Sequence, residues 1–451
     1  MSNTIVLKKG LDIPIAGAAE PVVSKTALTD IIAIQPSDFK GLTPRLLVKE
    51  GDRVLAGSPV LSDKLRPEIL VTSPVSGTVQ GIVRGEKRKL LAVCIANDHL
   101  QTCADSASAP SAGADAQQVK KALLAAGLWP WIVQRPYGVI ADPGATPKAI
   151  FVSAFSTAPL APDPVFCFDG SLKYIQAAIS ALAGLSAGGV HVGLPAGTDS
   201  PFARLTGCTL HRFAGKHPAG NVGVQISHIC PIRKDETVWT VSLLGLEAIG
   251  RFLATGKVDL RRKVAVCGPM AIEPSYVETL PGMQMKEIAG HYGTSAAEIR
   301  FISGDALSGR SIGEDGCLGF FDNQITLLRE GTEEELLGWI RPLRWKQYSH
   351  DHSYFSWLTP WRRYGMDTNL HGGPRAFLMN EGYYQKVLPM DIFPVFLAKA
   401  CLAGDIEKME KFGIYEVLPE DLAVCEFIDP SKNNIQDIIA QGIDLMRKEM
   451  A

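Results

Sequence analysis

The stretch VKEGDRVLAGSPVLSDK at residues 48–64, followed by TSPVSGTV at residues 72–79, carries the clearest fold signal in the chain. Valine and leucine runs flank a turn at Gly51–Asp52 and a second turn at Pro74–Gly77. Glycine, proline and aspartate favour tight turns, whereas β-branched residues favour strands. The pattern therefore predicts short strands joined by tight turns in a thin β sandwich.

The same pattern of strands and turns extends over residues 1–103, where glycine and proline separate short apolar runs. The expected strands are Ile31–Ile34, Leu46–Val48, Pro59–Leu61, Ile69–Val71, Thr78–Val83 and Leu90–Ile95. Many short strands with regular turn signals are typical of a small barrel or sandwich. Residues 102–115 are small and polar and cannot bury a core, so we expect a linker there.

Residues 116–257 alternate between helical and strand patterns, which favours a mostly parallel sheet covered by helices. The expected helices are 117–126, 172–185 and 246–254, and the expected strands are 149–153, 189–192 and 238–241. Residues 258–330 begin with an expected strand at 263–267, and their pattern predicts a small α+β module. Residues 331–451 combine aromatic loops with helical periodicity at 395–402 and 435–447.

Composition excludes several classes of function. The formal net charge of the 451-residue chain is -2, and no basic tail is present, so no nucleic-acid partner is expected. The nine cysteines form no C-x-x-C pair, which argues against a zinc or iron–sulfur site. The apolar stretch 387–403 contains Asp391, Pro394 and Lys399, so we predict no membrane span. In Met1–Gly10 two lysines follow a short apolar stretch, so we predict no signal peptide.

Residues 48–79 resemble the half-repeats of lipoyl- and biotinyl-type carrier domains, which are barrel-sandwich hybrids. In those domains the modified lysine lies at a hairpin tip, at a fixed distance from a following Pro-x-x-Gly. Here Lys64 precedes Pro74 by ten residues, and Pro67 interrupts the hairpin. We therefore expect a structural sandwich that carries no lipoyl arm.

Six further stretches, spread from one end of the chain to the other, extend the resemblance. They are KKGLDIPIAG at 8–17, GLW at 127–129, RPY at 135–137, KHPAG at 216–220, LREG at 328–331 and LPMD at 388–391. In this order they resemble the A subunits of the sodium-translocating NADH:quinone oxidoreductases. None is a catalytic signature by itself, so their number and order carry the resemblance.

The resemblance implies a peripheral subunit on the cytoplasmic side of the bacterial inner membrane. Its partners would be the integral-membrane and flavin-bearing subunits of the complex, especially the B subunit. FMN, FAD, riboflavin and the iron–sulfur cluster would belong to those partners, and no cofactor to this chain. Quinone would be the substrate, and we expect the isolated chain to be inactive alone.

The resemblance also implies a domain order, because these A subunits are similar to the Rnf complex C subunit and to the flavin subunit of complex I. We expect a barrel-sandwich hybrid over 1–103, a Rossmann-like domain over 116–257 and a ubiquitin-like, β-grasp SLBB module over 258–330. A mainly helical, ferredoxin-like tail without clusters would occupy 331–451.

Two departures from those relatives limit the chemistry of this chain. Where they have a glycine-rich FMN and NADH loop, this chain has AGLWPW at 126–131, whose bulky rings would obstruct a phosphate cradle. Where they have cluster ligands, this chain retains one cysteine. The two sets of positions hold Leu378, Glu381, Tyr384 and Leu388, and Pro419, Leu422, Cys425 and Asp429. A cubane needs about four thiolates, so neither cluster is expected.

A quinone requires an apolar, aromatic slot with one or two donors for its carbonyl oxygens. Trp129, Trp131, Arg135 and Tyr137 gather such groups on one segment, and His217 adds a group that titrates near neutrality. These five residues form the predicted quinone site. The alternative interpretations are that the Trp-Pro-Trp segment caps the domain and that His217–Pro218 forms a turn, which such segments more often do.

Three readings of function follow: a quinone-binding component of the complex, a cofactor-free scaffold for assembly, and a flavin- or NADH-binding oxidoreductase. The aromatic loop from Trp339 to Tyr364 fits either a partner interface or local core. His350, Asp351 and His352 resemble metal ligands, but no third ligand type follows nearby, so we expect a surface loop and no metal.

Overall fold

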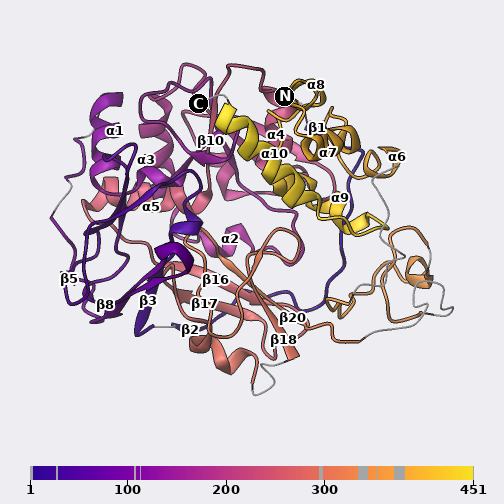
Figure 1. The fold of residues 1–451 in the computed structure, drawn as a ribbon, viewed down its shortest axis with the longest axis horizontal. Coiled ribbons are helices and arrows are strands. Elements are labelled where there is room, and N and C mark those ends of the chain that lie inside the picture. The colour runs from indigo at the N-terminus through magenta and orange to yellow at the C-terminus, as the bar shows by residue number, and fades with distance from the viewer. Residues whose placement is uncertain are drawn as a thin grey trace.

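The computed structural model describes residues 4–26, 29–105, 108–111, 113–293, 298–333, 344–352, 354–369 and 381–449. Figure 1 shows the N-terminal strands at the lower left, an α/β layer above them and a second β layer below. The C-terminal helices lie at the upper right, and residues 344–369 form a separate lobe at the right edge. Trp339 and Leu378, both named above, lie outside the described residues.

The N-terminal strands form two small antiparallel sheets, ordered β3-β9-β8-β5 and β4-β6-β7. Their bounds are Ile31–Ile34 (β3), Pro44–Leu46 (β4), Arg53–Val54 (β5), Pro59–Asp63 (β6), Leu70–Thr72 (β7), Gly77–Arg84 (β8) and Leu90–Asn97 (β9). Inward-facing Ile32, Val60 and Val79 are fully or almost fully buried in one core. The predicted small sandwich is confirmed.

With the sandwich counted as one unit, the second sheet is seven-stranded and has the order β1-β14-β13-β12-β15-β10-β11. Its strands are Thr4–Val6 (β1), Ile132–Arg135 (β10), Val139–Ile140 (β11), Ile150–Ser153 (β12), Val190–Pro195 (β13), Thr209–Ala214 (β14) and Val238–Val241 (β15). The five strands from β1 to β15 run parallel, and β10 and β11 add an antiparallel edge. The predicted mostly parallel sheet is confirmed.

Both faces of this sheet are covered. On the face of Ile150 and Val152 lie the helices α1 (Ala116–Ala125), α3 (Leu172–Ala183) and α5 (Leu243–Thr255). The short helix α2 (Pro164–Cys167) packs on the next sheet. On the face of Phe151 lie α4 (Val222–Ile229) and the C-terminal helices. Helices on both faces explain why these strands are almost continuously apolar.

The third sheet has the order β19-β18-β20-β16-β17-β2 and contributes to a separate hydrophobic core. Its strands are Val23–Thr26 (β2), Arg262–Cys267 (β16), Ser275–Thr279 (β17), Ile299–Ser303 (β18), Arg310–Ser311 (β19) and Gln324–Arg329 (β20). The chain's first residues therefore enter the second sheet through β1 and the third through β2 before they reach the N-terminal sandwich. The domain limits given above remain predictions.

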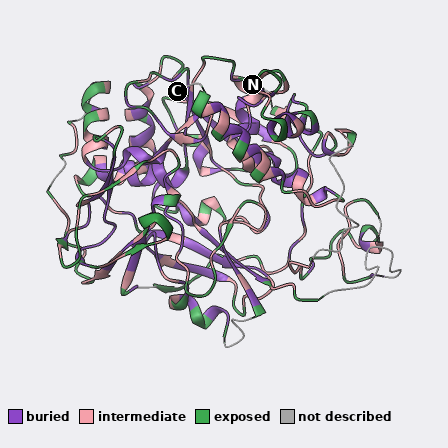
Figure 2. Cartoon of the chain, in the orientation of Figure 1, coloured by how far each residue is buried: buried purple, intermediate pink, exposed green. Residues whose placement is uncertain are grey.

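The C-terminal segment is helical where it was expected to be. Its helices are Glu381–Tyr384 (α6), Pro394–Ala403 (α7), Ile406–Phe412 (α8), Ala423–Ile428 (α9) and Ile435–Glu449 (α10). Cys425 is fully buried among them, and burial raises the pKa of its thiol. Figure 2 shows buried residues concentrated in the strands and on the inner faces of these helices. Among the described residues, no helix is long and apolar enough to cross a membrane.

Candidate functional site

The five predicted site residues lie on two connected segments of the α/β layer. Trp129 and Trp131 belong to the short 3₁₀ helix η3 (Trp129–Trp131), Arg135 ends β10, and Tyr137 lies in the turn before β11. His217 lies between β14 and α4. The structure does not bring all five to one cavity.

Trp129 and Trp131 pack at the junctions between layers. Trp129 is fully enclosed, donates from Nε1 to the Ala141 carbonyl at 2.8 Å and meets Trp239 edge to face. The Trp131 ring contacts Phe321 with centroids 4.9 Å apart, and the buried Arg262 guanidinium lies 5.4 Å from its centroid. The Trp131 contacts join the α/β layer to the third sheet.

The residues before these tryptophans pack against the N-terminal sandwich. Gly127 has a φ of +66°, and a Cβ there would lie 2.4 Å from Thr72 Cγ2. Only glycine fits such a close approach with positive φ. The AGLWPW segment is therefore a packed junction between two domains.

Arg135 holds the C-terminal segment to the sheet. Its side chain is buried, and its guanidinium bonds Asp421 Oδ2 at 2.9 Å and Glu420 Oε1 at 3.2 Å. Asn221 donates to the Glu420 carbonyl at 3.1 Å and strengthens the same contact. All of these acceptors lie in the 3₁₀ helix η9 (Pro419–Leu422).

His217 is buried beside this junction. Its Nδ1 lies 3.2 Å from Thr157 Oγ1, and its Nε2 has no hydrogen-bond partner among the described residues. Burial lowers the pKa of the imidazole, although the carboxylates of Asp305, Asp12 and Asp421 oppose that shift. The ring is therefore neutral at pH 7.

Tyr137 is the one predicted residue that borders a large cavity. The cavity has a volume of about 570 Å³ and lies between the 3₁₀ helix η1 (Pro36–Asp38), the start of β9, the β10–β11 turn and α10. Its apolar lining includes Phe39, Leu42, Leu90, Leu91, Val139 and Ile443. We refer to this cavity as the Tyr137 cleft.

Tyr137 adopts an uncommon backbone conformation, with a φ of +84°. Bulky residues rarely occupy that region, and such residues concentrate at functional sites. Burial, followed by the carboxylates of Glu410 and Asp235, raises the pKa of the Tyr137 hydroxyl. The hydroxyl therefore keeps its proton at neutral pH and is available as a donor.

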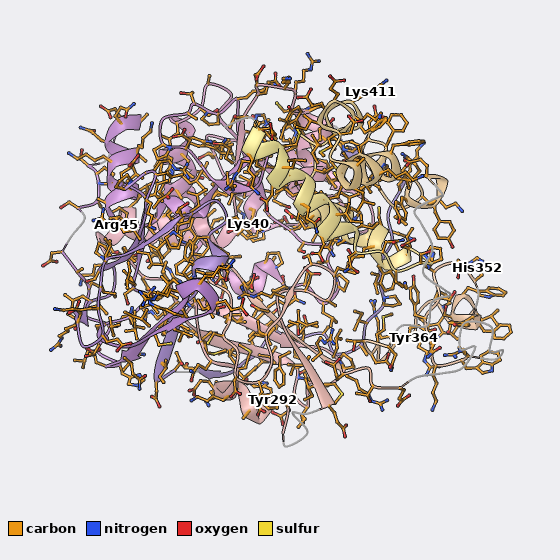
Figure 3. All side chains as sticks on the ribbon, in the orientation of Figure 1. Lys40, Arg45, Tyr292, His352, Tyr364 and Lys411 are labelled. Carbon is orange, nitrogen blue, oxygen red and sulfur yellow. The ribbon has the colours of Figure 1, made fainter. Side chains whose placement is uncertain are left out.

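Several charged residues of the Tyr137 cleft were not predicted. Lys40 lies at the centre of Figure 3, Lys89 precedes β9, and Asp444 and Arg447 lie on α10. The spacing of Ala440, Ile443, Asp444 and Arg447 places them on one helix face, which was the only local signal. Nothing in the sequence links that face to residues 36–44.

A second cavity, of about 380 Å³, lies between the 344–369 lobe and the C-terminal helices. Tyr348, Tyr364 and Phe427 line it together with His350 and Lys432. His350 meets Tyr383 edge to face, and its Nε2 has no hydrogen-bond partner in the described part of the chain. No cluster of three metal-ligating side chains occurs among the described residues.

A third cavity, of about 290 Å³, lies at the carboxyl ends of β12 and β15, next to Ser153 and Ser242. Ligands of open α/β sheets bind at such places. Here Ser242 Oγ already accepts a hydrogen bond from Gly245 N and caps α5, and the carboxylates of Asp305 and Asp322 face the cavity. Two acidic groups and a capped helix do not fit a phosphate-bearing cofactor.

Three family models match successive parts of the chain. They are described as the NqrA N-terminal barrel-sandwich hybrid domain at residues 5–98, the NqrA second alpha/beta domain at residues 114–258 and the NQRA C-terminal domain at residues 263–313. Together they match well over half of the chain, in the order of the N-terminal sandwich, the α/β layer and the third sheet.

Full-length relatives agree with these matches. The chain is 36% identical over 454 residues to the A subunit of the Na(+)-translocating NADH-quinone reductase of Serratia proteamaculans, covering 99% of this chain and 100% of that protein. It is 34% identical to the protein of the same name from Rhodopirellula baltica, with 98% of each chain covered. A solved NAD+-reducing [NiFe]-hydrogenase aligns over 74% of this chain and 63% of its own, at 11% identity and a TM-score of 0.37, which is too low to assign a shared fold.

Proposed function

The chain belongs to the NqrA family, the A subunits of the Na+-translocating NADH-quinone reductases, and on that premise we propose that it contributes a quinone-binding site to such a complex. It acts as a peripheral subunit on the cytoplasmic side of the membrane. Its partners are the integral-membrane and flavin-bearing subunits, the B subunit above all. The flavins and the iron–sulfur cluster belong to those partners.

The Tyr137 cleft is the observation that carries this proposal. It is the largest cavity among those described, and its walls combine aromatic and aliphatic side chains with donors at the rim. A quinone ring packs against Phe39, Leu90 and Val139, while the Tyr137 hydroxyl donates to a carbonyl oxygen.

The other four predicted residues do not line the cleft but hold its walls in place. Trp129 and Trp131 fix the segment that leads into the β10–β11 turn, and Arg135 fixes the other wall through η9. Neutral His217 lies behind the same junction. We propose that these four hold the shape of the cleft and that Tyr137 touches the ligand.

The finer fold relationships also belong to this proposal. We infer a lipoyl-like origin for the N-terminal sandwich, a Rossmann-like origin for the α/β layer and a β-grasp origin for the third sheet. The C-terminal helices would derive from a ferredoxin-like tail in which Cys425 is the one remaining thiol. The buried position of Cys425 among apolar side chains supports this view.

Cleft filling tests the binding role. Leu90→Trp adds bulk inside the cleft, and Leu65→Trp makes the same change at a side chain that is 79% exposed and does not line the cleft. Titration calorimetry of the full chain with a short-chain ubiquinone should show saturable binding in the wild type and Leu65→Trp, and loss of binding in Leu90→Trp. Equal binding by both variants would exclude this cleft.

A cofactor-free scaffold is the second candidate, and the burial of Trp129, Trp131 and Arg135 at domain junctions favours it. A scaffold requires the fold but no occupied cleft. If the complex that contains Leu90→Trp assembles and reduces quinone at the wild-type rate, the scaffold explains the chain better than the quinone site does.

A further inference from the structure

Positive charge gathers around the Tyr137 cleft. Lys40 follows η1, Lys89 precedes β9 and Arg447 lies on the last turns of α10, so three separate segments supply one cation each. Asp444 is the one acidic side chain in the lining. The lining therefore has a formal charge of +2, from three cations and one carboxylate.

These cations are not already neutralised. Among the described residues, none of Lys40, Lys89 and Arg447 forms a side-chain hydrogen bond or an ion pair. Cations elsewhere on the surface, such as Lys148 and Lys234, pair with Glu236 and Glu410 at 2.9 Å. The cleft thus keeps a positive field over an apolar floor.

An apolar floor with unpaired cations favours a flat ligand that carries negative charge. The other two large cavities differ in this respect. Lys346 and Lys432 in the 344–369 cavity are balanced by Asp351 and Asp367, and the cavity at β12 and β15 has only acidic charged groups. Charge complementarity therefore singles out the Tyr137 cleft.

We propose that the Tyr137 cleft selects the anionic form of its quinoid ligand, that is, a deprotonated hydroxyquinone or a quinone that has gained one electron without a proton. The proposal rests on the quinone-binding function given above and adds the charge of the ligand. Ring and tail pack on Phe39, Leu90 and Val139, and Lys40, Lys89 and Arg447 face the charged oxygen.

A matched pair of ligands tests the charge. 1,4-Naphthoquinone is neutral, and 2-hydroxy-1,4-naphthoquinone is an anion at neutral pH with almost the same shape. Calorimetric titration of the full chain at low ionic strength should give about tenfold tighter binding of the anion, because each exposed cation contributes a modest attraction. Raising the salt concentration should weaken the binding of the anion and leave the affinity for the neutral quinone unchanged.

The variant Lys40→Gln/Lys89→Gln/Arg447→Gln should lose the preference for the anion but still bind the neutral quinone. Its control is Lys121→Gln/Lys257→Gln/Lys411→Gln, which removes three exposed cations that do not line the cleft and should retain the preference. Leu90→Trp should abolish the binding of both ligands.

Each outcome decides between the two proposals. Equal affinity for the two naphthoquinones overturns the charge preference and leaves quinone binding intact. Anion binding that survives Leu90→Trp overturns the assignment to this cleft. Decanoate that competes as strongly as the hydroxyquinone overturns the quinoid assignment and indicates a site for anionic lipid. Failure of both quinones to bind overturns the proposed function itself.

Discussion

Arg135 Nη1 donates to Asp421 Oδ2 at 2.9 Å, and both side chains are buried although 286 residues separate them in the chain. One end of β10 is thereby fixed to η9 in the C-terminal segment. Pro419 of η9 and Tyr137, two residues after Arg135, both line the same cleft. The ion pair therefore connects the packing of the tail to the shape of the candidate site.

Removing one partner of this pair should be strongly destabilising. Arg135→Ala leaves the Asp421 carboxylate buried without its cation, and we expect a loss of about 3–5 kcal/mol in the free energy of unfolding. Urea denaturation followed by circular dichroism measures it. The exposed pair of Lys148 and Glu236 is the control, since Lys148→Ala should cost no more than about 1 kcal/mol. Equal losses in the two variants would contradict the role of burial.

A methyl group at Gly127 should disturb the contact between the sandwich and the α/β layer. Gly127→Ala combines a positive φ with a Cβ 2.4 Å from Thr72 Cγ2, and we expect a lowered melting temperature and about 2–4 kcal/mol of destabilisation. Gly189→Ala shares the positive φ, at +70°, but its Cβ meets nothing within 4 Å. That control should cost only about 1–2 kcal/mol.

The contribution of His217 to the stability of the fold should fall as the solution becomes mildly acidic. Burial holds the pKa of His217 below its ordinary value, so the unfolded chain takes up a proton that the folded chain excludes. Stability is therefore unaffected well above the unfolded pKa of about 6.5, and decreases as the pH falls below it. His191, His211 and His350 have pKa values lowered by burial and contribute in the same direction.

His217→Gln should reduce this pH dependence by up to about 1.4 kcal/mol per pH unit, which is the contribution of one proton. Urea denaturation between pH 7.5 and pH 5 measures the slope. His352→Gln is the control, because His352 is exposed. If both variants keep the wild-type slope, His217 does not exclude a proton in the folded chain.

Removal of the Tyr137 hydroxyl should weaken quinone binding without unfolding the chain. Tyr137→Phe keeps the ring and loses one donor, and we expect about three- to tenfold weaker binding in calorimetry. Because the pKa of this hydroxyl is raised, the affinity of the wild type should not change between pH 7 and pH 9. Tyr383→Phe is the control, since the Tyr383 hydroxyl bonds Asp351 in the other cavity. Equal weakening by both variants would contradict direct contact by Tyr137.

Much of the local structure could be predicted from the sequence. Turn residues and β-branched runs located β6, β8 and β9, and apolar periodicity located α3, α7 and α10. The helix expected at 246–254 is α5, which Gly256 ends at a φ of +72°. These features depend on interactions between residues that are close in the chain, so a short stretch of sequence is enough to predict them.

The candidate site could be predicted only in part. Tyr137 borders the cleft, but Trp129, Trp131 and His217 were grouped with it because they are aromatic or titratable, and the structure places them in packed junctions. Lys40 and Lys89 gave no signal, because charged residues on exposed turns are common in any sequence. Arg447 shared one helix face with three other lining residues, but nothing linked that face to the rest of the cleft.

By itself, the sequence determined the family, the alternation of strands and helices and the lack of any C-x-x-C pair, because each depends on residue identity and spacing alone. Only the tertiary structure decided that β1 and β2 pair with β14 and β17, that Asp421 is the partner of Arg135 and that η1, β9 and α10 enclose one cleft. Most of these contacts join residues more than two hundred positions apart. They form because the folded chain as a whole must bury its apolar surface and pair its backbone groups. A local sequence pattern does not show which distant segments meet that requirement together.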